Sequence, residues 1–148
     1  MLFLLLQLGP DRYAIAARDV VEVLPLVQIK RLPQTPPEIA GLFDYRGKPV
    51  PLLDLSQLAF GVPARPRRST RILLVDCHEG RLLGLIAEGA TAMLRCEAEA
   101  FLPAGTHEPA APWLGPVVRD ERGLVQRIEW QQLLTPALRE RLFDGLPA

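Results

Sequence analysis

Apolar residues occur along this chain in short runs that come in pairs, with turn-forming residues between the two members of each pair. The paired runs are residues 3–8 with 13–17, 39–45 with 50–53, and 72–76 with 82–87, and the turns are Gly9-Pro10-Asp11-Arg12, Arg46-Gly47-Lys48-Pro49 and residues 78–81. Short apolar runs bounded by glycine, proline and charged residues are typical of β-hairpins. The pattern therefore predicts three hairpins.

The segment after the first hairpin has two interpretations. Asp19 precedes the apolar residues 20–24 and could cap one or two helical turns, although the β-branched residues there suit a strand equally well. Pro25 ends this element, and residues 27–32 are expected to form another short strand.

Two short helices are predicted where a capping signal precedes an apolar stretch. Asp54 is a suitable N-cap for residues 55–60, which Gly61 then terminates. Pro136 suits the first position of a last amphipathic helix over residues 137–143.

The second half of the chain repeats the plan of the first. A shift of about 70 residues superposes 14–17 on 84–87 and 20–24 on 90–94. Arg46-Gly47 likewise has its counterpart in Arg122-Gly123. The repeat predicts a single mostly-β domain over residues 1–148. It would comprise two small antiparallel barrels, about 1–62 and about 70–148, joined by a linker at about 63–69 and packed together because each is marginally stable alone.

Composition narrows the classes of protein that fit this fold. The chain has 148 residues with 17 basic and 17 acidic side chains, so its formal net charge is zero. This balance disfavours both charge-driven disorder and general attraction to nucleic acid. The apolar N-terminal run is short and leads into a turn, and no stretch approaches the roughly 20 apolar residues of a membrane span. We expect a cytoplasmic protein without direct membrane insertion.

Candidate catalytic groups are few. Cys77 and His78 could form a nucleophile or metal-ligand pair, but adjacent residues of an extended chain point to opposite faces. The chain has no glycine-rich phosphate-binding motif. Arg65, Arg67 and Arg68 form a short basic run that is more simply a solvated loop than a nucleic-acid site. The sequence therefore predicts a binding module without enzymatic activity, cofactor or metal, whose inter-barrel groove suits an amphipathic helix.

A family resemblance supports this view. The segments that carry it are, in order, Gln7-Leu8-Gly9, Tyr13-Ala14-Ile15, Val20-Val21-Glu22-Val23, Leu32-Pro33-Gln34-Thr35-Pro36, residues 39–47 and residues 50–55. In this order and spacing the chain resembles the CheW-like coupling proteins of bacterial chemosensory systems. The resemblance implies two five-stranded SH3-like barrels with short helices, one of them at the C-terminus. It also implies an adaptor that is peripheral to membrane receptor arrays.

The resemblance also implies partners and contact residues. The partners would be the cytoplasmic helical hairpin of a methyl-accepting chemoreceptor, the regulatory domain of a CheA-type histidine kinase, and other CheW-like proteins. Val20, Glu22 and Arg46 match residues implicated in receptor contact. Because an unpaired buried charge is costly, Glu22 and Arg46 should either lie on the surface or pair with one another.

Some positions depart from the family pattern and leave alternatives open. They are Asp44-Tyr45 before the Arg-Gly turn, Ala87-Glu88 in the second half, and the proline-rich residues 101–112. These departures suggest an alternative pathway, such as surface sensing or pilus control. The competing hypotheses are a small β-barrel enzyme or metal protein that uses Cys77 and His78, and an OB- or SH3-like nucleic-acid binder.

Overall fold

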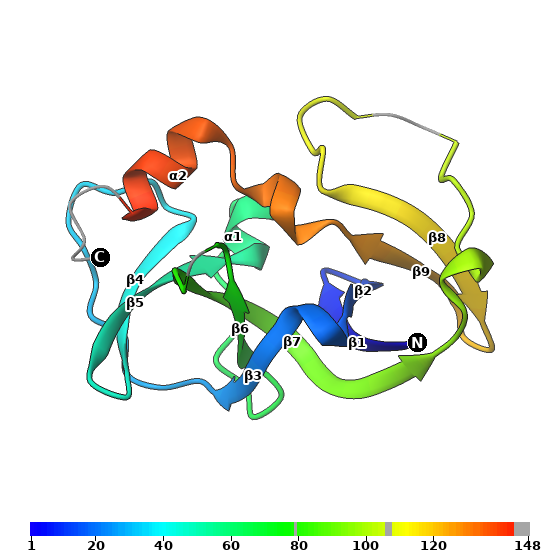
Figure 1. Cartoon of the computed structure of the whole chain (residues 1–148), viewed down its shortest axis with the longest axis horizontal. Helices are drawn as coiled ribbons and strands as arrows, with labels where there is room; N and C mark the ends of the chain where they lie inside the picture. The colour runs from blue at the N-terminus through cyan, green and yellow to red at the C-terminus, as the bar shows by residue number, and fades with distance from the viewer. Residues whose placement is uncertain (79, 106–107, 144–148) are drawn as a thin grey trace.

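The computed structural model describes residues 1–78, 80–105 and 108–143 (Figure 1). Within them the chain forms nine strands and two α-helices, in a mostly-β fold. The elements are β1 Leu2–Leu8, β2 Asp11–Ala16, β3 Val20–Pro25, β4 Ile39–Tyr45, β5 Lys48–Asp54, α1 Leu55–Phe60, β6 Arg71–Asp76, β7 Leu82–Arg95, β8 Leu114–Asp120, β9 Gly123–Ile128 and α2 Pro136–Phe143. The three predicted hairpins are confirmed as β1–β2, β4–β5 and β6–β7. Both predicted helices are also present, and α2 is the last element of the described residues.

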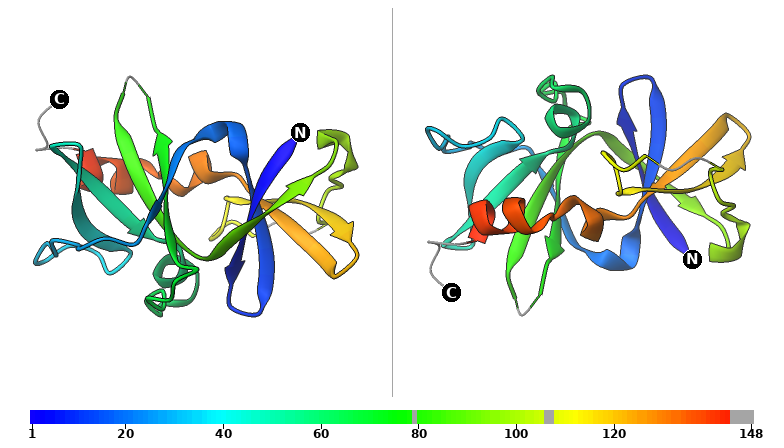
Figure 2. Two further views of the ribbon diagram at one scale, coloured as in Figure 1. Left: turned by 90° about the horizontal axis from the view of Figure 1, so that it is seen from below. Right: turned by 90° about the horizontal axis from the view of Figure 1, so that it is seen from above.

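The strands form two five-stranded barrels that share β7. Figure 2 shows the two groups of strands side by side. The first barrel contains β3, β4, β5, β6 and the beginning of β7. The second contains β1, β2, β8, β9 and the end of β7. The two-barrel fold is as expected, and most pairings are antiparallel. Each barrel also contains one short parallel pairing, β5 with β7 and β2 with β9.

The barrels are not the two sequential halves that the repeat predicted. The hairpin β1–β2, from the first half of the chain, pairs with β9 and β7 in the second barrel. The hairpin β6–β7, from the second half, pairs with β5 in the first barrel. Each barrel thus combines the first hairpin of one repeat with the second hairpin of the other. Residues 63–69 accordingly connect α1 to β6 within the first barrel and are not a linker between barrels.

The long strand β7 crosses from one barrel to the other. Its residues 82–87 pair with β6, and residues 92–95 pair with β1. The register with β1 shifts between Leu5 and Gln7, close to Gly89 on β7. Gly89 has φ +62°, and a Cβ there would lie 3.0 Å from Gln7 Oε1. A glycine therefore permits the bend by which one strand serves both barrels.

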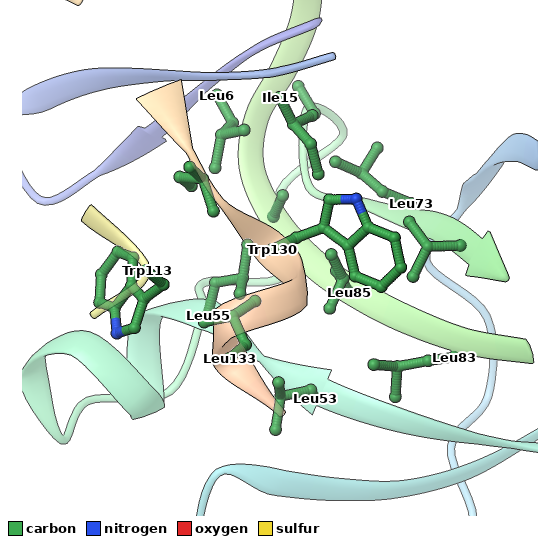
Figure 3. Packing of buried hydrophobic residues seen from close by; sticks show 14 of the residues in the cluster. Leu6, Ile15, Leu53, Leu55, Leu73, Leu83, Leu85, Trp113, Trp130 and Leu133 are labelled. Atoms are coloured by element: carbon green, nitrogen blue, oxygen red, sulfur yellow. The ribbon is translucent and has the colours of Figure 1, made fainter. Parts of the chain in front are cut away.

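Side-chain alternation along the strands builds three apolar clusters. On β6, Ile72 and Leu74 fill the first barrel, whereas Leu73 and Val75 point into a larger cluster between the barrels. On β1, Phe3 fills the second barrel, and Leu4 and Leu6 join the shared cluster. Figure 3 shows this shared cluster around Trp130 and Leu85. Because β1 and β6 are buried on both faces, their sequences are continuous apolar runs.

The structure decides between the two interpretations of residues 20–24 and corrects the strand predicted at residues 27–32. The segment after Asp19 is the strand β3 and not a capped helix, and Asp19 instead accepts a hydrogen bond of 3.2 Å from Trp130 Nε1. Residues 27–32 do not form a strand, because their backbone pairs with β4 only through the single bridge between Lys30 and Leu42. No helix among the described residues is long and apolar enough to cross a membrane.

Candidate functional site

Strand β3 presents different side chains on its two faces. It lies at one end of the sheet order and, among the described residues, pairs with β6 alone. Glu22 and Leu24 are half-buried on one face, whereas Val21 and Val23 are 56% and 38% exposed. The register with β6 shifts between Val20 and Glu22, so Val20 lies opposite Val75 and not on the face of Glu22 and Leu24. Val20 packs against the cluster between the barrels. The exposed apolar face of β3 is therefore formed by Val21 and Val23, which the sequence analysis did not single out.

The β4–β5 turn places Arg46 at the tip of a hairpin. Tyr45 pairs with Lys48, so Arg46 and Gly47 are the two central residues, with φ angles of 50° and 84°. Two successive positive φ angles are typical of the type I′ turns that connect tight hairpins. Asp44 Oδ1 accepts a hydrogen bond of 2.8 Å from the Gly47 amide and stabilises this turn. Arg46 thus has a defined backbone conformation beneath a solvent-exposed side chain.

Glu22, Tyr45 and Arg46 form one cluster where this turn meets β3. Glu22 Oε1 accepts hydrogen bonds of 2.7 Å from the Tyr45 hydroxyl and 3.2 Å from Arg46 Nη2. The Arg46 guanidinium also lies 5.1 Å from the centroid of the Tyr45 ring, within the range of a cation–π contact. The hydrogen bond to Glu22 is the main reason why the pKa of Tyr45 lies above its usual value.

The structure unites two of the three candidate contact residues. Glu22 on β3 and Arg46 in the β4–β5 turn form an ion pair at the surface, and their side chains are 34% and 74% exposed. Val20 lies two positions from Glu22 on the same strand and packs inward. Sequence reasoning missed Tyr45 as a member of the cluster, although Tyr45 belongs to one of the departures from the family pattern.

The Cys77 thiol is poorly suited to nucleophilic or metal chemistry. Burial raises its pKa to about 11, so it stays protonated near neutral pH. Cys77 packs against the shared apolar cluster. Within the described part of the chain, histidine, cysteine and acidic side chains form no group of three or more that could hold a metal ion. His107, the second histidine of the sequence, lies outside the described residues.

The basic run at residues 65–68 forms hydrogen bonds with neighbouring residues of the protein. Arg65 Nε donates a hydrogen bond of 3.0 Å to Glu88 Oε1 on β7. The hydroxyl of Thr70 donates to the carbonyl of Arg65, and the amide of Arg67 donates to that hydroxyl at 3.3 Å. One of the three arginines is therefore already paired within the protein, which weakens the case for a phosphate-binding surface.

Comparison with known proteins gives a consistent result. The family model described as CheW-like domain matches residues 2–137. The chain is 30% identical over 88 residues to "Chemotaxis protein CheW" of Helicobacter pylori, which covers 60% of this chain and 53% of that protein. It is 29% identical over 102 residues to "Chemotaxis protein CheW" of Klebsiella aerogenes, covering 69% and 61%. The chain thus spans little more than half the length of these relatives.

A solved structure matches the fold over nearly its whole length. It is the crystal structure of scaffolding protein TtCheW from Thermoanaerobacter tengcongensis, with a TM-score of 0.76 and 25% sequence identity. The match covers 90% of this chain and 87% of that one. The similarity therefore extends over both barrels.

Proposed function

This chain belongs to the CheW-like domain family, and from that premise we propose that it is a non-catalytic adaptor of a bacterial chemosensory array. In this role it couples the cytoplasmic helical hairpin of a methyl-accepting chemoreceptor to the regulatory domain of a CheA-type histidine kinase. The two relatives compared above are named as chemotaxis proteins, and the similar crystal structure is of a scaffolding protein. The protonated Cys77 thiol argues against the competing reading as an enzyme or metal protein.

The observation that carries the proposal is the surface pair of Glu22 and Arg46 beside the exposed face of β3. Two charged residues 24 positions apart in the chain meet at the turn between β4 and β5. Charged pairs at the edge of an interface orient partners and accelerate association. We assign Glu22 and Arg46 to the rim of the receptor interface and Val20 to its apolar part.

The remaining surfaces leave room for further partners. The second barrel lies outside the Glu22–Tyr45–Arg46 cluster, so we propose that a kinase domain or another CheW-like protein binds there while the receptor is held. We propose that the adaptor works in the cytoplasm, at the periphery of a receptor array. An alternative pathway, such as surface sensing or pilus control, is consistent with Asp44-Tyr45 before the Arg46-Gly47 turn.

The proposal is tested by assembling the complex from purified parts. The receptor hairpin, the kinase regulatory domain and this chain are mixed in pairs and all together, and the species are separated by size. We expect this chain to bind each partner separately and to bring both into one ternary complex. Failure to bind either partner would exclude the adaptor function, and the identity of the receptor that binds would indicate the pathway.

A further inference from the structure

The two hydrogen bonds that converge on Glu22 Oε1 differ in length and in exposure. The bond from the Tyr45 hydroxyl is 2.7 Å long and partly buried. The bond from Arg46 Nη2 is longer, at 3.2 Å, and exposed. Short charge-assisted hydrogen bonds are the stronger ones, whereas exposed ion pairs contribute little. Glu22 is therefore held mainly by Tyr45, and Arg46 is the more easily released partner.

Tyr45 is itself anchored on the core of the first barrel. Its ring lies 6.2 Å, between centroids, from that of Phe43, which is buried in the cluster inside that barrel. Tyr45 packs against the same cluster. The hydroxyl is consequently presented to β3 from a ring whose position is set by buried neighbours, whereas the Arg46 guanidinium lies over that ring on a solvent-exposed side chain.

We propose that Tyr45 is a positioning residue for receptor binding, which holds the Glu22 carboxylate so that Arg46 can exchange its bond to Glu22 for one to an acidic side chain of the partner. This inference rests on the proposed adaptor function. While Arg46 is engaged with the partner, the Tyr45 hydroxyl continues to satisfy Glu22 Oε1, so no half-buried carboxylate oxygen loses both of its donors. The partner contact opposite Arg46 is therefore a carboxylate on the receptor hairpin.

The inference predicts an effect that a single substitution can reveal. Tyr45→Phe keeps the ring beneath Arg46 but removes the donor to Glu22, so the carboxylate then depends on Arg46 alone. Arg46 should be held more firmly within the protein, and the affinity for the receptor hairpin should fall by about three- to tenfold. Tyr13→Phe is the matched control, since Tyr13 lies on β2 in the second barrel and should leave the affinity unchanged.

A double substitution separates this role from a merely structural one. In a Glu22→Ala background neither acceptor oxygen is present, so adding Tyr45→Phe should have little further effect on receptor affinity. An equal loss with and without Glu22→Ala would overturn the inference, as would an affinity unchanged by Tyr45→Phe alone. Melting temperatures of all variants report any loss of folding.

A partner-free measurement tests the hydrogen bond itself. The chain contains two tyrosines, so in a Tyr13→Phe background the alkaline absorbance change reports Tyr45 alone. Glu22→Gln should lower the midpoint of this titration, because the carboxylate that favours the protonated phenol has been removed. An unchanged midpoint would overturn the inference even where the receptor hairpin binds. Absence of binding by the unmodified chain would instead overturn the adaptor function, and the positioning role with it.

Discussion

Arg12 and Asp120 lie 108 positions apart in the chain, yet their side chains form a two-bond ion pair. Arg12 Nη1 donates to Asp120 Oδ2 at 2.7 Å, and Nη2 donates to Oδ1. The pair joins β2 to the end of β8, beside the parallel pairing of β2 with β9 that completes the second barrel. The ion pair thereby links the β1–β2 hairpin to the β8–β9 hairpin.

This ion pair predicts a loss of stability in acid. The bonds from Arg12 lower the pKa of Asp120 to about 2. A carboxylate with a lowered folded-state pKa stabilises the fold above its unfolded pKa of about 4, and this contribution is lost as the pH falls through about 2. Asp120→Asn should destabilise the protein by about 1–2 kcal/mol at pH 7 and by much less near pH 2. Denaturant unfolding at the two pH values measures this, and an equal difference at both would contradict it.

The buried carboxylate of Asp54 has two structural tasks. Asp54 accepts a hydrogen bond of 3.2 Å from the amide of Gln57, which caps α1. It also accepts one of 3.0 Å from the amide of Ala64, which holds the loop after α1 in place. Asp54→Ala should cost about 1–3 kcal/mol of stability, because both amides lose their acceptor. Asp54→Asn retains one acceptor oxygen and should cost less. Equal losses for the two variants in urea unfolding would show that the hydrogen bonds are not the cause.

Gly84 is required by close packing where β7 meets β5. A Cβ at this position would lie 2.5 Å from Leu52 Cδ2 and 2.9 Å from Ile72 Cγ2, inside the first barrel. Gly84→Ala should therefore destabilise the protein by about 1–3 kcal/mol through overpacking. Adding Leu52→Val should recover part of this loss, since it removes side-chain volume at the point of contact. Thermal unfolding of the single and double variants tests the prediction, and an unaltered midpoint for Gly84→Ala would refute it.

The raised pKa of Cys77 predicts selective thiol chemistry. Because burial shifts that pKa to about 11, the thiolate is scarce at pH 7 and alkylation of the folded protein at Cys77 should be slow. The rate should rise as the pH approaches 11, and it should rise strongly at pH 7 when the protein is unfolded. Mass spectrometry of peptides after timed alkylation follows this, with Cys96 as the second thiol in the same sample. Rapid modification of folded Cys77 at pH 7 would contradict the prediction.

Much of the local structure could be predicted because it depends on neighbours in sequence. Turn residues between apolar runs located three hairpins, and Asp54 identified the start of α1. The exchange of hairpins between the barrels could not be predicted in this way. Strand periodicity tells which side chains are buried but not which strand lies beside them. In β6 both faces are apolar and buried, so the sequence alone does not show which side chains point into the first barrel and which point between the barrels.

The candidate site was predictable in part for the same reason. The family resemblance pointed to Glu22 and Arg46, and the cost of an unpaired buried charge left either surface exposure or mutual pairing. The structure shows that they are paired and solvent-accessible. The role of Tyr45 depends on how β3 lies beside the β4–β5 turn, which no local pattern reports. For Val20 the sequence could not decide between two roles, because an apolar side chain suits both inward packing and partner contact. The structure shows that Val20 packs against the cluster between the barrels.

The most direct test of the adaptor account is the titration of the receptor hairpin against Arg46→Glu. Reversing this charge should weaken binding by roughly 1–3 kcal/mol, more than an exposed ion pair contributes alone, because like charges would then face each other at the interface edge. Arg122→Glu is the matched control, since Arg122 is exposed beside Gly123 in the counterpart turn of the second barrel. We predict a weakened complex and a preserved melting temperature for Arg46→Glu, and unchanged binding for Arg122→Glu. Equal affinity of Arg46→Glu and the unmodified chain for the hairpin would contradict the account.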